Sequence, residues 1–250
     1  MRFKNKVALI TGGARDIGKA IAQRIAAEGG KVVINYFQSS SLAEQTLSEI
    51  KSEGGDAVIF KADVRRASEV KKLVEFVVAT YGDRLDILVN NAGGIVVRKK
   101  LREQDEEFYD AVMDLNVKSV FLVTRSFVPM MTSGGAIVNV SSLAARDGGG
   151  GGAALYAASK GAITTYTRGL AKELGPEGIR VNAVCPGLID TTFHDIFTPD
   201  DVRAKVASGT PLRREGTSGE VSNLVAFLAS EEASFITGAN YDINGGLGLY

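Results

Sequence analysis

The sequence predicts an open α/β fold in which helices cover both faces of one parallel sheet. Short apolar runs alternate with longer amphipathic segments along the whole chain. The runs are apolar throughout, as in strands that are buried on both faces. A glycine-rich turn, Thr11 to Gly18, joins the first run to the first amphipathic segment. We therefore expect a doubly wound sheet of about seven strands, in a single domain over residues 1–250.

The order of elements follows from the same periodicity. We expect strands at 7–10, 31–36, 57–61, 87–90, 136–141, 179–185 and 240–243. We expect helices at 17–28, 42–53, 68–81, 105–131, 153–174 and 220–229, the fourth of them kinked before Pro129. No internal linker or repeat interrupts this alternation.

Composition excludes several classes of function. The chain has 250 residues, 45% of them apolar, and 29 basic residues balance 29 acidic ones. Because no basic stripe stands out, nucleic acid and anionic membranes are not expected partners. The single cysteine rules out an internal disulfide and suits a reducing compartment. We expect a soluble, cytoplasmic protein without a metal site.

The segment from Ala153 to Ala162 carries the strongest chemical signal. It is rich in alanine and lacks proline, which predicts a helix. In a helix, Tyr156 and Lys160 are four residues apart and lie on one face. A nearby ammonium group favours phenolate, and a tuned tyrosine can exchange a proton with a carbonyl or hydroxyl oxygen. The alternative is an aromatic side chain that packs inward beside a solvated lysine.

Other polar groups follow the predicted strands at the edge where open parallel sheets bind ligands. The turn from Gly12 to Gly18 offers backbone N–H groups to a diphosphate. Asp63 can accept a hydrogen bond from an adenine amino group or can simply begin a helix. The segment Asn90 to Gly93 can face a ribose or form only a turn. This convergence on one edge favours a nucleotide-dependent enzyme.

Two further polar residues are candidates for the functional site. Ser142 follows the fifth strand and can offer its hydroxyl to a substrate oxygen. Asn116 interrupts an apolar helical stretch and must find partners if it is buried. It either bends the helix and holds a water near Lys160, or satisfies only local backbone groups.

The second strand bears on cofactor choice. NAD selection uses an acid at the end of this strand, but here the strand runs from Asn35 into Ser39 and Ser40 with no carboxylate. Arg15 can meet a 2′-phosphate, and a serine hydroxyl can add a hydrogen bond. For a nicotinamide dinucleotide, which the family resemblance described next implies, we therefore expect NADP(H) to be preferred, with NAD(H) possible.

The chain resembles the short-chain dehydrogenase/reductase family over nearly its whole length. The matching pieces are Thr11 to Gly18, Asp63-Val64, Asn90 to Gly93, Asn116, Ser142, Tyr156 to Lys160, Pro186-Gly187, and Ile236 to Gly246. The resemblance implies a Rossmann fold, and within the family the chain is most similar to 3-oxoacyl-[acyl-carrier-protein] reductases. Sugar and other secondary-alcohol dehydrogenases look similar, and a non-catalytic nucleotide-binding sensor is an alternative of another class.

The resemblance also implies roles for individual residues. Tyr156 is the general acid in reduction, Lys160 lowers its pKa and binds the nicotinamide ribose, Ser142 holds the substrate oxygen, and Asn116 supports a water. The expected cofactor-binding set is Gly12, Arg15, Asp16, Ile17, Gly18, Asn35, Ser39, Asp63, Val64, Asn90, Ala92, Gly93, Tyr156, Lys160, Pro186, Gly187, Ile189 and Thr191. The family further implies a homotetramer, a small-molecule or acyl-thioester substrate, and a substrate lid at about residues 188–214.

The chain departs from the family pattern at two places. The family usually has glycine where this chain has Asp16. We expect the Asp16 carboxylate to turn away from the phosphates and cap its own helix. Compared with the family, the stretch from Ser142 to Tyr156 has one extra residue, within the glycine run Gly148 to Gly152. This run lies beside the expected substrate entrance.

Overall fold

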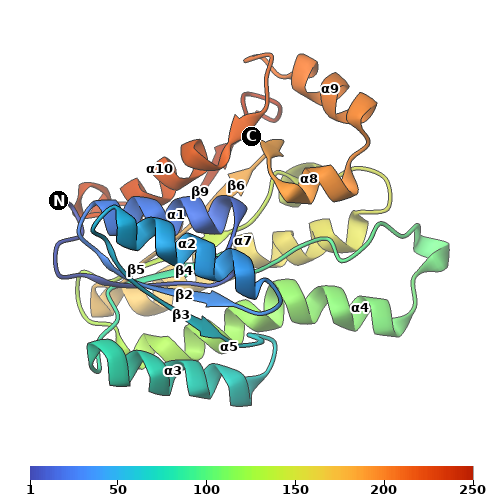
Figure 1. The fold of residues 1–250 in the computed structure, drawn as a ribbon. Coiled ribbons are helices and arrows are strands. Elements are labelled where there is room, and N and C mark those ends of the chain that lie inside the picture. Colours follow the sequence, from blue (N-terminus) through green and yellow to red (C-terminus); the bar gives the residue numbers. More distant parts are fainter. Residues whose placement is uncertain (250) are drawn as a thin grey trace.

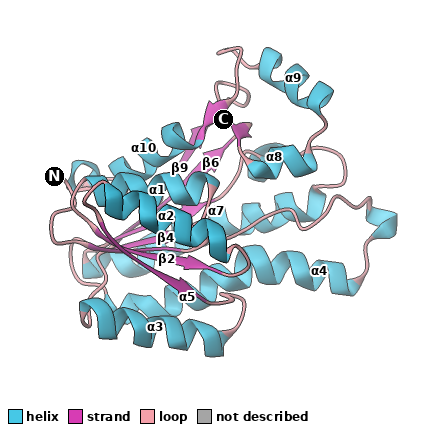
Figure 2. Cartoon of the chain, viewed as in Figure 1, coloured by secondary structure: helices cyan, strands magenta, loops and turns pink. Residues whose placement is uncertain are grey.

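The computed structural model describes residues 1–249 and contains a parallel sheet of seven strands. The strand order is β3-β2-β1-β4-β5-β6-β9, and every neighbouring pair runs parallel. Figure 2 shows the strands as a layer between helices. The predicted fold class, a doubly wound α/β sheet, is therefore confirmed.

The bounds of the elements lie close to those that the sequence predicts. The sheet strands are β1 (Val7–Ile10), β2 (Lys31–Tyr36), β3 (Asp56–Lys61), β4 (Ile87–Asn90), β5 (Ala136–Val140), β6 (Arg180–Pro186) and β9 (Asn240–Ile243). The helices are α1 (Asp16–Ala27), α2 (Ser40–Ser52), α3 (Ala67–Tyr81), α4 (Glu106–Met113), α5 (Ser119–Phe127), α6 (Ala144–Asp147), α7 (Ala154–Leu174), α8 (Thr192–Phe197), α9 (Asp200–Gly209) and α10 (Ser218–Ala229).

Two apolar cores hold the layers together. Helices α1, α2 and α10 pack on one face of the sheet, through side chains such as Ile21, Ile50 and Val225. Helices α3, α5 and α7 pack on the other face, through side chains such as Leu73, Phe127 and Leu170. Figure 1 shows these two groups on opposite sides of the strands. Burial on both faces explains why the strand sequences are apolar throughout.

The strand order places the loops that matter for function. The chain runs outward from β1 through β2 to β3, then crosses back to β4 on the other side of β1. The loops after β1 and β4 therefore diverge at the carboxyl edge, where open α/β sheets bind ligands. The glycine-rich turn follows β1, and Asn91-Ala92-Gly93 follows β4.

The predicted helix at 105–131 is not continuous. It divides into α4, a π-helical segment η2 (Asp114–Lys118), α5, and a short 3₁₀ turn η3 (Val128–Met130) that contains Pro129. The break expected at Pro129 is present. The π-helical segment is centred on Asn116, and π-bulges of this kind are frequent at functional sites.

Residues 188–214, the predicted lid and called the lid segment below, leave the main sheet at its carboxyl edge. The short strands β7 (Ile189–Asp190) and β8 (Gly216–Thr217) pair at the base of the segment, and α8 and α9 lie between them. Arg203 of α9 binds the carboxylates of Asp190, Asp195 and Glu215 and so ties the segment together. In Figure 1 the two helices, in orange, stand off the edge of the sheet. Among residues 1–249 no helix is both long and apolar enough to cross a bilayer.

Candidate active site

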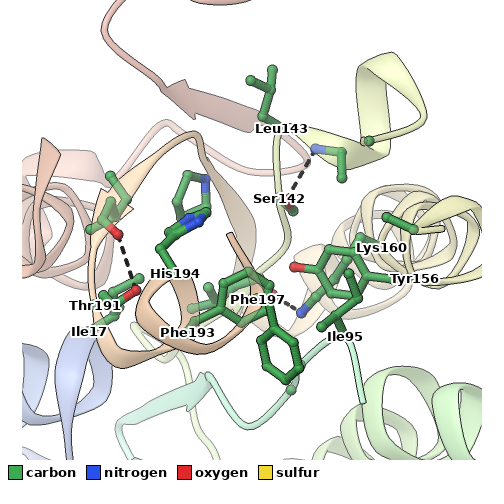
Figure 3. Close-up of a pocket in the computed structure, with 18 of the residues that line it drawn as sticks. Ile17, Ile95, Ser142, Leu143, Tyr156, Lys160, Thr191, Phe193, His194 and Phe197 are labelled. Atoms are coloured by element: carbon green, nitrogen blue, oxygen red, sulfur yellow. Dashed lines mark hydrogen bonds between the residues drawn. The ribbon is translucent and has the colours of Figure 1, made fainter. Parts of the chain in front are cut away.

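A cleft of about 730 Å³ opens at the carboxyl edge of the sheet. Its walls come from the glycine-rich turn, the loop after β4, the end of β5, α7, the end of β6 and the lid segment. Figure 3 shows Tyr156, Lys160, Ser142 and the lid residues Phe193 and Phe197 around this space. The volume falls within the range of small-molecule and cofactor sites.

The glycine-rich turn forms one end of the cleft. Gly12 adopts a positive φ of +62°, and a Cβ on Gly18 would lie 2.3 Å from the carbonyl oxygen of Gly12, so the turn can be this tight only with glycine there. The Asn91 side chain donates to the carbonyl oxygens of Thr11 and Gly12, both at 3.0 Å. The turn is thus held rigidly against the loop after β4.

Tyr156 and Lys160 extend from α7 into the other end of the cleft. The Lys160 ammonium lies 5.9 Å from the centre of the Tyr156 ring and donates to the Val140 carbonyl oxygen at 2.8 Å. The Ser141 hydroxyl donates to the Lys160 carbonyl oxygen at 2.9 Å, which fixes α7 against the end of β5. Ser142, the next residue, lines the cleft and accepts from the backbone N–H of Ala144 at 3.1 Å.

Burial sets the protonation of these groups. Desolvation raises the pKa of Tyr156, and the Ser142 hydroxyl and the charge of Arg98 oppose that rise only in part. Desolvation also lowers the pKa of Lys160 to about 8. The pKa of Tyr156 thus lies above its ordinary value, whereas the sequence led us to expect a lowered one, because burial of the phenol outweighs the groups that favour phenolate. The phenol is a proton donor at neutral pH.

Asn116 lies beside these residues although its side chain does not line the cleft. It is fully buried, accepts from the Gly94 N–H at 3.0 Å, and donates to the carbonyl oxygens of Gly94 and Val112 at 2.9 and 3.0 Å. A Cβ on Gly93 would lie 2.8 Å from Asn116 Oδ1 and 2.9 Å from Lys160 Nζ. Gly93 therefore lets the loop after β4 fit closely between Asn116 and Lys160.

The cleft brings together most of the predicted site residues. Those that line it are Gly12, Arg15, Asp16, Ile17, Gly18, Ala92, Gly93, Ser142, Tyr156, Lys160, Pro186, Gly187, Ile189 and Thr191. Those predicted for the cofactor but placed outside its lining are Asn35, Ser39, Asp63, Val64 and Asn90. Asn35, Ser39, Asp63 and Val64 lie in or after β2 and β3, which are separated from β4 and β5 by β1. Asn90 ends β4, next to β5.

Three of these outlying polar side chains have partners within the protein. The Asp63 carboxylate accepts two hydrogen bonds from the Arg65 side chain, both at 2.8 Å, and this pairing lowers the pKa of Asp63. The free carboxylate expected there for an adenine amino group is thus already engaged. The Asn90 side chain donates to Asn139 and Thr124, and Asn35 donates to the Ala62 carbonyl oxygen, so both brace the sheet.

Asp16 does not cap its own helix as expected. The N-cap position of α1 is Arg15, with no side-chain cap, and the Asp16 carboxylate instead accepts from the backbone N–H and the hydroxyl of Thr192. The geometric reason is the positive φ of Asp16, +51°, at the first position of the helix. The Asp16 carboxylate also forms an ion pair with Arg15, at 3.7 Å.

Sequence reasoning missed several residues of the cleft. Phe193 and Phe197 on α8 form an aromatic wall, with the Phe193 ring centre 6.2 Å from that of Tyr156 and 5.2 Å from that of Phe197. Arg98 donates to the carbonyl oxygens of Phe197 and Gly151 at 2.9 and 3.1 Å, joining the lid segment to the glycine run. Only a three-dimensional arrangement reveals these residues, because their local sequence carries no motif.

Comparisons with known proteins identify similar chains. A family model described as enoyl-(acyl carrier protein) reductase matches residues 12–248. A short-chain dehydrogenase/reductase of Cryptosporiopsis sp. is 40% identical, over 98% of this chain and 96% of that protein. The 3-oxoacyl-[acyl-carrier-protein] reductase FabG of Staphylococcus aureus is also 40% identical, over 97% of this chain and 98% of that protein.

A solved structure extends the likeness to three dimensions. The short-chain dehydrogenase of Burkholderia cenocepacia in complex with NADP has a TM-score of 0.92 and 36% identity, and the match covers 99% of each chain. The match thus extends over the sheet, the cleft and the lid segment. The chain belongs to the short-chain dehydrogenase/reductase family of oxidoreductases.

Proposed function

We propose that this protein is an NADP(H)-dependent reductase that converts a ketone, in particular a 3-oxoacyl thioester, into a secondary alcohol. One observation carries the proposal: Tyr156, Lys160 and Ser142 converge at one end of a cleft whose other end is a rigid glycine-rich turn. Backbone N–H groups at such a turn suit a diphosphate, and the cleft extends from there to Tyr156.

The chain's own residues supply orientation and a proton. When bound, the reduced nicotinamide supplies the hydride that adds to the carbonyl carbon. The Ser142 hydroxyl donates to the carbonyl oxygen, and the Tyr156 hydroxyl transfers its proton to that oxygen as the alcohol forms. Since burial raises the pKa of Tyr156, the phenol carries this proton at neutral pH. Lys160 holds a positive charge beside the phenolate that is left.

The lining of the cleft favours an apolar ketone over a sugar. Beyond Tyr156 the walls are formed by Ile95, Leu143, Phe193, Phe197 and Val206. A sugar hydroxyl placed against these side chains would lose water without gaining a hydrogen bond, whereas the polar lining residues Arg98, Asp147, His194 and Thr198 offer fewer partners than a sugar with several hydroxyls needs. The 40% identity to a 3-oxoacyl-[acyl-carrier-protein] reductase supports the acyl thioester as the first substrate to test.

The end of β2 supports the preference for NADP(H). No carboxylate follows Asn35 that would bind a ribose 2′-hydroxyl and repel a 2′-phosphate. Arg15 lies in the glycine-rich turn, lines the cleft and offers a guanidinium group to a phosphate. The complex of the related Burkholderia enzyme with NADP is consistent with this choice.

The proposal includes the cellular form of the enzyme. We place it in the cytoplasm, because its single cysteine suits a reducing compartment. We propose a homotetramer, because α5 exposes Phe121 on a face that the rest of the chain leaves open.

A panel of ketones tests the proposed function. NADPH consumption is measured with a 3-oxoacyl thioester, a sugar ketone and a cyclic ketone, each with wild-type protein and with Tyr156→Phe. We expect the thioester to be reduced fastest, and only by wild type. Reduction of the sugar ketone alone would favour a sugar dehydrogenase. Cofactor binding without reduction of any ketone would favour the non-catalytic sensor.

A further inference from the structure

Asp16 occupies a backbone conformation that normally belongs to glycine. Its φ of +51° lies in the left-handed region, which disfavours residues that carry a Cβ, although Asp tolerates it better than most. Glycine would adopt this conformation without strain. A strained residue beside a binding cleft indicates that its side chain serves a purpose there.

The Asp16 side chain reaches from the glycine-rich turn to the lid segment. Its carboxylate accepts from the Thr192 N–H at 3.2 Å and from the Thr192 hydroxyl. The same hydroxyl accepts from the Arg15 guanidinium at 2.6 Å. Three groups from two distant parts of the chain therefore share one hydrogen-bond network, and the carboxylate charge strengthens it.

Thr192 is the first residue of α8, a helix of six residues. Its N–H belongs to the first turn and has no partner within the helix, so the Asp16 carboxylate satisfies it from outside. A helix this short depends on contacts with the rest of the protein to stay formed. At its other end Arg98 donates to the Phe197 carbonyl oxygen at 2.9 Å, so α8 is tied down at both ends.

The residue after Thr192 is Phe193, which packs beside the catalytic tyrosine. Its ring centre lies 6.2 Å from that of Tyr156, and Figure 3 shows the two side chains next to each other in the cleft. Asp16 therefore contacts Thr192, and the residue that follows Thr192 is Phe193, which lies beside Tyr156.

We propose that Asp16 is a positioning residue that holds α8, and with it Phe193, over the substrate end of the cleft. The inference rests on the proposed reductase function and adds to it a link between the glycine-rich turn and the ketone site. Without the contact between Asp16 and Thr192, the first turn of α8 is less ordered. The ketone then binds beside a Phe193 side chain that is held less firmly. The backbone of residue 16, which faces the diphosphate end, stays in place.

The test compares Asp16→Gly and Thr192→Val with their double variant. Glycine keeps the positive φ, and valine keeps the shape of threonine while it removes the hydroxyl. We expect each single variant to raise the ketone KM by ~3- to 10-fold, with a smaller change in kcat. Because the two residues act through one contact, the double variant should be little worse than either single variant. Thr192→Ser keeps both the backbone N–H and the hydroxyl that donate to Asp16, so its ketone KM should equal that of wild type.

Hydrogen exchange provides a readout that does not depend on the substrate. Amides of residues 192–197 should exchange faster in Asp16→Gly and Thr192→Val, but not in Asp200→Asn, which removes an exposed carboxylate from α9. Unchanged exchange in Asp16→Gly, or additive effects of the two variants on KM, would overturn the inference. A tenfold tighter NADPH Kd for Asp16→Gly with the ketone KM unchanged would also overturn it, because the carboxylate would then act on the diphosphate. If wild type reduced no ketone, the proposed function would fail, while exchange would still decide the role of Asp16.

Discussion

The end of the cleft at Tyr156 holds a lysine whose burial is unfavourable for its charge. Lys160 is nearly inaccessible to solvent, and desolvation lowers its pKa from 10.5 to about 8. The unfolded chain therefore binds more protons than the folded chain between these two values, and the free energy of unfolding rises with pH in that window. Below about pH 8 the folded protein bears the full cost of the buried charge.

Because the buried charge of Lys160 costs stability, we expect its removal to raise the free energy of unfolding and to lower reductase activity. We expect Lys160→Met to stabilise the protein at about pH 7 and to lose that advantage toward about pH 10, while reductase activity falls strongly at both. Urea unfolding at the two pH values measures the effect. Lys172→Met, which replaces an exposed lysine on the same helix, is the control and should change little. A stability gain that does not depend on pH would contradict the assignment of the buried charge.

At the residue scale, motif residues were easier to predict than their partners. Tyr156, Lys160 and Ser142 meet in the cleft because they lie on α7 and at the end of the neighbouring strand β5. The partner of Asp16 could not be found in this way, since Thr192 is 176 positions away. The pKa direction of Tyr156 was also missed, because it depends on burial by residues such as Phe193 that no motif identifies.

At the scale of elements, we expect the second strand and the glycine-rich turn together to set the preference between NADPH and NADH. We expect Arg15→Ala to reduce the ratio of kcat/KM for NADPH to that for NADH by about tenfold, because a charge-assisted contact to the 2′-phosphate is lost. Arg24→Ala removes a guanidinium group from the same helix, where it pairs with Glu28, and should leave the ratio unchanged. Equal efficiency of wild type with both cofactors would contradict the prediction.

Periodicity predicted the regular elements well and the irregular ones poorly. The strands of the sheet and the helices that cover it appear within a few residues of their predicted bounds, because burial on a defined face imposes a clear pattern. The π-helical segment at Asn116 was not predicted as such, since its register follows from the side-chain bonds of Asn116 to Gly94. Helices α8 and α9 were missed because none of their residues is fully buried, so they lack a clear apolar face.

At the scale of the whole molecule, exposed aromatic side chains predict assembly into an oligomer. Phe121 on α5 is 44% exposed and Tyr109 on α4 is 49% exposed, so two neighbouring helices present aromatic side chains to the surface. We expect a homotetramer with two-fold axes, in which such side chains are covered. Light scattering at micromolar concentration measures the mass. A monomer would contradict the prediction, and Phe121→Glu tests whether this face takes part.

The overall fold was the most predictable feature, because strand order in a doubly wound sheet follows general rules of connection. The loops after β1, β4, β5 and β6 meet at one edge for that reason. The depth and lining of the cleft were not predictable in the same way, since they depend on how the lid segment packs over that edge.

The central claim is that Tyr156 gives a proton to a carbonyl oxygen in this cleft. Tyr156→Phe keeps the ring and removes only the hydroxyl, so the most direct measurement is its rate of ketone reduction with saturating NADPH, together with its NADPH Kd. We predict a loss of rate of about 10²- to 10⁴-fold with the NADPH Kd nearly unchanged. Turnover close to that of wild type would remove Tyr156 from the mechanism and contradict the account.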